Sequence, residues 1–243
     1  MIRTLYMIIL AYFLTGGIAF YVIGKKKTRE EARHNRIKFF AYFVIINGVF
    51  LSIVIQPVVF RILAGIIVVT GFYELVTLFR NSGYLKKRFF LLSLCSYCLL
   101  SAGFICFSNL ERNWILFTFI ILSVFDSFSQ IAGQLFGRHK IASKTSPNKT
   151  LEGLVGGIVM SLVTSFLIRD LVGFGIRTVL LLTAGVIVWA FLGDLAASFY
   201  KRRYNVKDFS RLIPGHGGNL DRFDSLIACG AWMFFVACLI NVT

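Results

Sequence analysis

The chain has 243 residues, of which 57% are hydrophobic and 15% charged, with 26 phenylalanines and a formal net charge of +15. A soluble domain carries about 25% charged residues, so this composition excludes a soluble globular protein and indicates an integral membrane protein. The positive charge lies mostly in loops between apolar stretches, as in membrane proteins, and we therefore expect membrane lipids and not nucleic acid as partners.

Apolar stretches long enough to cross a bilayer, which takes roughly 20 residues, recur along the whole chain. They predict an all-α, polytopic membrane protein with about eight transmembrane helices. The first stretch is expected to remain as an anchor, because Lys25–Lys27 follow it directly and no small-residue cleavage site precedes them. The predicted spans are residues 5–24, 38–57, 58–79, 89–108, 114–137, 151–169, 177–200 and 223–242.

The basic residues predict the orientation of these spans. If eight spans alternate, the loops that hold most of the 26 Lys and Arg lie on one side of the membrane. By the positive-inside rule this side is cytoplasmic, so we expect both termini outside and an active site that faces the cytoplasm of the inner membrane. The four basic loops are residues 25–38, 80–88, 138–150 and 201–222.

The chain changes character near residue 113. Residues 1–113 have few polar side chains in their spans and are interpreted as a membrane scaffold, whereas residues 114–243 hold most acids and glycines and are interpreted as the catalytic half. Both halves are expected to form one structural domain. The five cysteines lie in predicted spans, and we interpret them as small packing residues and not as a redox or zinc pair.

Span 114–137 carries a polar stripe at steps of three and four residues, which places its members on one face of a helix. We interpret it as the wall of a polar cavity, with interhelical hydrogen bonds as the alternative, because it includes a charged residue. In the next span, Gly153 and Gly157 predict close packing against a neighbouring helix. The stripe consists of Ser123, Asp126, Ser127, Gln130 and Gln134.

Three aspartates are expected near the cytoplasmic ends of the last two spans. Asp194 lies near the end of one span, and Asp221 and Asp224 are three residues apart at the start of the next. Acids at one depth repel each other unless a cation lies between them, and oxygen ligands without nearby cysteine favour Mg²⁺ over zinc. The alternative is that each acid pairs with a local base, such as Arg222.

Phosphate-binding side chains surround these acids in the sequence. Lysine and arginine suit phosphate, and the glycine-rich stretch 214–218 lets backbone N–H groups approach a ligand closely. For Asp208, an ion pair with the neighbouring Lys207 is as good an explanation as a role in the site. The pattern predicts a site for metal and polyphosphate, suited to phosphoryl or nucleotidyl transfer to a lipid, and it contains no Walker A motif. The candidate bases are Lys149, Lys201, Arg202, Arg203 and Lys207.

These motifs resemble the signature of the phosphatidate cytidylyltransferase (CDP-diacylglycerol synthase) family over residues 126 to 226. The resemblance implies that an oxygen of phosphatidate attacks the α-phosphorus of CTP, giving CDP-diacylglycerol and pyrophosphate without a covalent enzyme intermediate. It also implies a homodimer. The matching motifs are Ser146–Thr150 with Glu152 and Gly153, Gly193–Leu195, Ser198, Lys201–Arg202, Lys207–Asp208, Pro214–Gly218 and Leu220–Asp224.

The resemblance further implies a role for each matching residue. Mg²⁺, with or without a second cation such as K⁺, would be held by Asp194, Asp221 and Asp224, and Lys201 would join these three as a catalytic residue. The substrate-binding residues would be Asp126, Ser146, Lys149, Thr150, Ser198, Arg202, Lys207, Asp208, His216, Gly217, Gly218 and Arg222.

Three residues depart from the family pattern and leave the acceptor lipid open. They are Ser129, Gln130 and Gln134. The alternative function is therefore that of a related CTP-dependent transferase acting on another lipid phosphate or a polyprenol. A distant alternative is an ion-coupled transporter with Asp126 and Glu74 along its path. That class places paired acids near the midplane, whereas most acids here cluster near one end of the spans.

Overall fold

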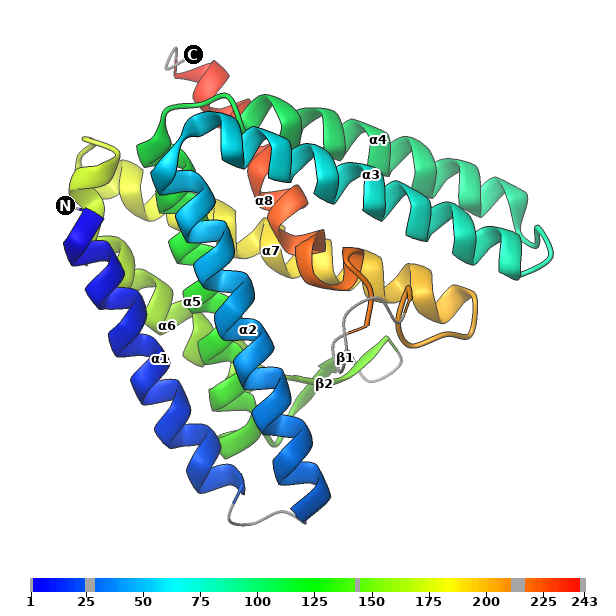
Figure 1. Ribbon diagram of the computed structural model, residues 1–243, viewed down its shortest axis with the longest axis horizontal. Helices are drawn as coiled ribbons and strands as arrows, with labels where there is room; N and C mark the ends of the chain where they lie inside the picture. Colours follow the sequence, from blue (N-terminus) through cyan, green and yellow to red (C-terminus); the bar gives the residue numbers. More distant parts are fainter. Residues whose placement is uncertain (1, 25–28, 143–144, 211–216, 241–243) are drawn as a thin grey trace.

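The computed structural model describes residues 2–24, 29–142, 145–210 and 217–240. Helices dominate this part of the chain, and one short antiparallel hairpin joins the fifth helix to the sixth (Figure 1). The elements are α1 (Ile2–Gly24), α2 (Arg29–Ile55), α3 (Pro57–Asn81), α4 (Lys87–Phe107), α5 (Arg112–Phe136), β1 (Lys140–Ala142), β2 (Ser146–Thr150), α6 (Leu151–Leu167), the 3₁₀ turn η1 (Arg169–Leu171), α7 (Ile176–Arg203) and α8 (Leu220–Leu239).

The all-α membrane fold is confirmed, and each predicted span coincides with a helix. Within the described residues, the helices α1, α3, α4, α5, α7 and α8 are long and apolar enough to cross a bilayer. The apolar parts of α2 and α6 are shorter, at Phe39–Ile55 and Leu151–Leu167. The predicted number of eight spans is therefore not confirmed, although the chain is an integral membrane protein.

Two predicted loops contain regular structure. Residues 29–38 form the first turns of α2, because their Arg, Glu, Ala and Lys side chains favour helix. Within the predicted loop 138–150, β1 pairs with β2, with Lys140 opposite Thr150 and Ala142 opposite Ser146. The hairpin carries the end of β2 back to α5 and sets the position of the residues just before α6.

The helices form two diverging groups (Figure 1). One group contains α3 and α4, and the other contains α1, α2, α5 and α6, with α5 packed against α6. Helix α8 packs against α4 of the first group and α5 of the second, and also against α7, so it joins the groups. The hairpin and the C-terminal end of α7 lie on the side toward which the groups diverge, whereas the start of α1 and the end of α8 lie on the opposite side.

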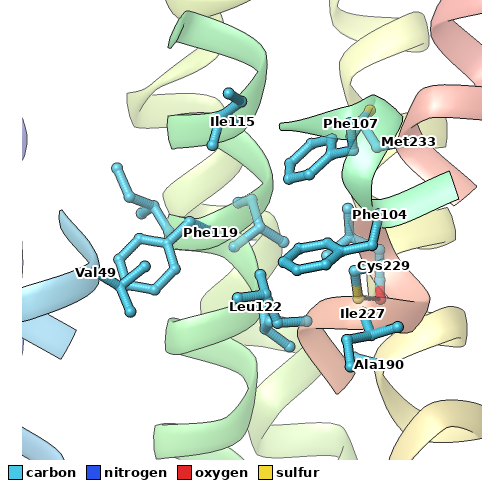
Figure 2. Close-up of a cluster of buried hydrophobic side chains, with 14 of the residues drawn as sticks. Val49, Phe104, Phe107, Ile115, Phe119, Leu122, Ala190, Ile227, Cys229 and Met233 are labelled. Carbon is cyan, nitrogen blue, oxygen red and sulfur yellow. Dashed lines mark hydrogen bonds between the residues drawn. The ribbon is translucent and has the colours of Figure 1, made fainter. Parts of the chain in front are cut away.

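The centre of the molecule is a cluster of large side chains from α4, α5 and α8 (Figure 2). Phe104 and Phe107 of α4 lie beside Met233 of α8, and all three side chains are fully buried. Leu122 of α5 completes the contact. Cys229 is buried in the same cluster, as expected for a packing residue. Dispersion contacts of this kind hold membrane helices together, so α4 belongs to the core of the fold.

Glycines allow α5 and α6 to approach closely. A Cβ atom at Gly153 would lie 2.7 Å from the carbonyl oxygen of Ser129, and one at Gly157 would lie 2.8 Å from that of Phe125. Backbone atoms cannot move aside as a flexible side chain does, so both positions exclude larger residues. The predicted close packing of Gly153 and Gly157 is confirmed.

The same interface predicts a difference between two glycine substitutions. Gly156→Ala would drive its Cβ into that of Ala132, and overpacking of this kind destabilises by about 1–3 kcal/mol. Gly48 in α2 is the matched control, because no atom lies within 4 Å of its Cβ position. Gly48→Ala should be neutral or stabilise by up to about 1 kcal/mol through helix propensity. Thermal unfolding in detergent measures both, and equal melting temperatures would contradict this packing.

Candidate functional site

A buried glutamate of α3 fastens the segment that leads into α8. Glu74 is 4% exposed, and its Oε1 accepts hydrogen bonds from Ser210 Oγ at 2.6 Å and Asn219 N at 2.9 Å. Its Oε2 accepts one from Leu220 N at 2.7 Å. The first N–H groups of a helix lack intrahelical partners, and the Asn219 side chain binds Thr70 and gives α8 no cap. Glu74 therefore caps α8 from a different helix, where the helix dipole also favours a negative charge.

Sequence reasoning missed this role of Glu74 and considered it only as part of an ion path. The available signal was a single carboxylate inside an apolar span, because a buried acid needs hydrogen-bond donors. Its partners were not predictable from spacing, since Ser210 lies 136 residues away and Leu220 lies 146 residues away. Helix α3 thus reaches the site from the half interpreted as scaffold, while the boundary near residue 113 stays a prediction.

Three donors hold Asp221 in place. Lys201 Nζ forms an ion pair with Oδ1, while Phe209 N and Gly218 N donate to Oδ2 at 2.9 Å and 2.8 Å. The lysine and aspartate side chains are only 10% and 2% exposed, so the pair is shielded from solvent. Gly217 has a φ of +83° and its Cβ would lie 2.9 Å from Asp221 Oδ2, so glycine is required there. Asp221 thus holds Phe209 and Gly218 beside the ends of α7 and α8.

In this structure Asp221 contacts a base and two backbone donors, and the role of the aspartate trio as metal ligands stays a prediction. Both oxygens of Asp221 already have partners, and no three Asp, Glu, His or Cys side chains in the described ranges are placed to hold a metal ion. For Asp221 the structure shows the alternative of pairing with a base, although the base is Lys201 and not the neighbouring Arg222. The physical reason is depth: Asp221 is enclosed by α7 and the loop, whereas Asp194 is 42% exposed.

A second group of carboxylates is open and comes from three helices. Asp194 of α7 lies 2.8 Å from Lys149 Nζ at the end of β2, and Ser198 Oγ donates to its other oxygen at 3.3 Å. Asp126 of α5 and Asp224 of α8 both lie within electrostatic range of Asp194. We call Asp126, Asp194 and Asp224 the acidic cluster. It contains two of the three predicted metal ligands and one predicted substrate-binding residue.

Basic residues border the acidic cluster. Lys149 and Arg222 lie within electrostatic range of Asp126, and Lys201 lies within range of Asp224. Lys149 also lies 4.5 Å from the centre of the Phe191 ring, which keeps its ammonium group beside α7. Carboxylates and ammonium groups at one place suit a phosphorylated ligand that binds together with a cation.

Several predicted substrate-binding residues shape the backbone around this cluster. Thr150 caps α6, since its Oγ1 accepts a hydrogen bond from Gly153 N at 3.2 Å. Arg202 Nε donates to the carbonyl oxygen of Thr145 at 3.2 Å and so ties the hairpin to α7. Ser146 lies at the start of β2 and is half-buried.

The remaining predicted residues lie on the loop between α7 and α8. Lys207 and Asp208 are exposed. Gly218 is buried, and a Cβ there would lie 2.6 Å from Glu74 Oε1, so the glycine is needed for the cap. His216 lies outside the described residues.

The polar stripe of α5 does not form one wall of this site. Ser123, Ser127 and Gln130 line a groove against α1 and α2. The two serine hydroxyls donate to carbonyl oxygens of their own helix, each at 2.7 Å. Ser127 Oγ also lies 3.4 Å from Tyr42 OH of α2, an interhelical contact of the kind given as the alternative. Gln134 is exposed, so only Asp126 of the stripe belongs to the acidic cluster. Asp126 lies at the edge of the stripe, toward α7.

The fold and the site define a polytopic membrane protein with a charged site near one end of an apolar helical bundle. Residues 89–240 match the model of the cytidylyltransferase family. The chain is 33% identical over 260 residues to the phosphatidate cytidylyltransferase of Staphylococcus saprophyticus, covering 99% of the chain and 97% of the relative. Identity to the enzymes of the same name from Staphylococcus epidermidis and Staphylococcus aureus is 32% and 31%, over 97% and 99% of the chain and 94% and 97% of these relatives. The chain belongs to the cytidylyltransferase family.

The cap on α8 predicts the effect of a single-atom change. Glu74→Gln keeps the side-chain shape but replaces one acceptor by an amide that faces N–H donors, so we expect a loss of about 1–3 kcal/mol in the free energy of unfolding. Glu111→Gln is the control, because Glu111 is exposed and makes no capping hydrogen bond at the start of α5. Thermal unfolding of both variants in detergent tests this, and equal stability would show that Glu74 does not hold α8.

Proposed function

We propose that this chain is a phosphatidate cytidylyltransferase, which transfers CMP from CTP to phosphatidate and releases pyrophosphate. Family membership and full-length similarity to enzymes of that name support this activity. The observation that carries the proposal is the acidic cluster of Asp126, Asp194 and Asp224 beside Lys149. It lies where apolar helices end, so a water-soluble triphosphate and a membrane lipid can meet there.

The side chains fit an in-line transfer between phosphates. An oxygen of phosphatidate forms a bond to the α-phosphorus of CTP while the bond to the β-phosphate oxygen breaks, and pyrophosphate leaves. The attacking phosphate is already ionised, so no protein base is needed, and positioning and charge compensation carry the reaction. Lys149 is suited to bind a phosphate, because its ion pair with Asp194 can exchange for one. Arg202 and Lys207 are exposed and supply further positive charge.

Mg²⁺ is the proposed cofactor, held by Asp194 and Asp224. Mg²⁺ commonly binds one or two carboxylates and completes its shell with substrate phosphates and water. The described residues fit this kind of coordination. Asp194 and Asp224 lie within electrostatic range of each other, and no third Asp, Glu, His or Cys among the described residues completes a set of three ligands with them. Bound there, the ion would compensate charge on the triphosphate. Asp126 is a further carboxylate in range for a second cation such as K⁺.

The proposed orientation places this site on the cytoplasmic side, with both termini outside. The hairpin and the end of α7 lie on one side of the bundle and the start of α1 and end of α8 on the other (Figure 1), which agrees with the positive-inside rule. The homodimer stays a prediction. The transporter alternative gains no support, because three donors already occupy the Glu74 carboxylate.

The test is turnover by the purified protein with CTP, Mg²⁺ and phosphatidate, followed as released pyrophosphate and labelled CDP-diacylglycerol. Asp224→Asn should lower turnover by about 10²–10³-fold, the usual cost of removing one charge-stabilising group, and should leave the melting temperature unchanged. Asp221→Asn should lower both, because it breaks a shielded ion pair. Asp170→Asn is the control, since its side chain is 90% exposed. Absence of pyrophosphate with every lipid phosphate would refute the proposal.

A further inference from the structure

A cleft between α4, α7 and α8 is lined mainly by apolar groups. Leu92 of α4 and Ala196 and Phe199 of α7 lie on its walls. Two hydroxyl groups in the lining are already hydrogen-bonded: Ser96 Oγ donates to a carbonyl oxygen of its own helix at 2.9 Å, and Tyr97 OH donates to one of α3 at 2.7 Å. These walls therefore suit hydrocarbon better than a polar ligand.

One member of the acidic cluster, Asp224, lines the cleft. Among the described residues of its lining, Asp224 is the one with a charged side chain. The same carboxylate lies within electrostatic range of Asp194 and Lys201. Gly193 lines the cleft beside it, and a Cβ there would lie 2.8 Å from that of Ala228, so α7 and α8 close the cleft tightly behind Asp224. A ligand in the cleft would thus have its polar end at Asp224.

The outer end of the cleft opens to the hydrocarbon of the bilayer. Leu92 is 71% exposed and Phe199 is 51% exposed, and both belong to helices able to cross a membrane. Exposed apolar side chains on such helices contact acyl chains. The cleft has a volume of about 340 Å³, within the range of small-molecule sites.

We propose that this cleft holds an acyl chain of the acceptor lipid, which enters sideways from the bilayer with its phosphate toward the end that Asp224 lines, where Lys201 lies within electrostatic range. This inference rests on the proposed function and adds a specificity site to it, in which Ser96 and Ala196 admit the chain because they are small. An acyl chain fits better than a helix of a second copy, because the cleft is continuous with a carboxylate of the reaction site.

Filling the cleft tests the proposal. Ser96→Phe and Ala196→Phe place a ring in it from opposite walls, and they should raise the KM for a long-chain phosphatidate about tenfold. The KM for CTP and the KM for a short-chain phosphatidate should change little. Cys95→Phe is the matched control, because Cys95 is the exposed neighbour of Ser96 in α4 and does not line the cleft. It should leave all three constants unchanged.

A second readout does not depend on turnover. A phosphatidate with a photoreactive group in one acyl chain should crosslink to α4 and α7 of the unaltered protein and of Cys95→Phe, and at least about fivefold less to Ser96→Phe and Ala196→Phe. Crosslinking without turnover would support the cleft and reject the proposed function. Turnover with KM values and crosslinks unaffected by either cleft variant would overturn this inference. A changed oligomeric state with equal losses for both substrates would also overturn it, by showing a protein interface there.

Discussion

Two carboxylates buried in apolar surroundings require hydrogen-bond donors, and the rest of the site depends on how that requirement is met. Glu74 and Asp221 take donors from Phe209, Ser210 and residues 218–220, so these residues are fixed against α3, α7 and the start of α8. An unpaired buried carboxylate would cost several kcal/mol, which makes this arrangement strongly preferred. Asp224 follows Asp221 by three residues on α8, and it is thereby brought within range of Asp194.

Five acids in and around the site therefore divide into two kinds. Glu74 and Asp221 have their oxygens occupied by nearby donors and serve the fold. The acidic cluster of Asp126, Asp194 and Asp224 differs in its exposure and mutual repulsion: Asp194 has a partner on each oxygen, but it is 42% exposed and lies within electrostatic range of the other two carboxylates. Such a cluster is stable when a cation, bound together with phosphates, compensates its negative charge. The division thus separates residues that stabilise the site from residues that act on a substrate. The cleft beside Asp224 gives the same site a route to the bilayer.

Features of the fold that depend on local sequence pattern could be predicted from the sequence. Apolar length predicted every helix, and the spacing of Gly153 and Gly157 predicted a close helix contact. The short motifs singled out Lys149, Asp194 and Asp224, and the structure brings these residues into one region, while their roles stay a prediction. Sequence spacing could not reveal that Lys201 forms an ion pair with Asp221 or that Glu74 caps α8. Both interactions depend on how helices far apart in the sequence pack together. The polar stripe predicted a cavity in the wrong place: Ser123, Ser127 and Gln130 line a groove against α1 and α2, and only Asp126 belongs to the acidic cluster.

The most direct test of the account is the position of the metal ion relative to the four aspartates. A crystal structure with Mn²⁺ in place of Mg²⁺ and a non-hydrolysable CTP analogue would locate the ion by its anomalous scattering. The account predicts the peak about 2.0–2.2 Å from carboxylate oxygens of Asp194 and Asp224, with Asp221 still paired to Lys201. A peak bound to Asp221 with Lys201 displaced, or one remote from the acidic cluster, would contradict it.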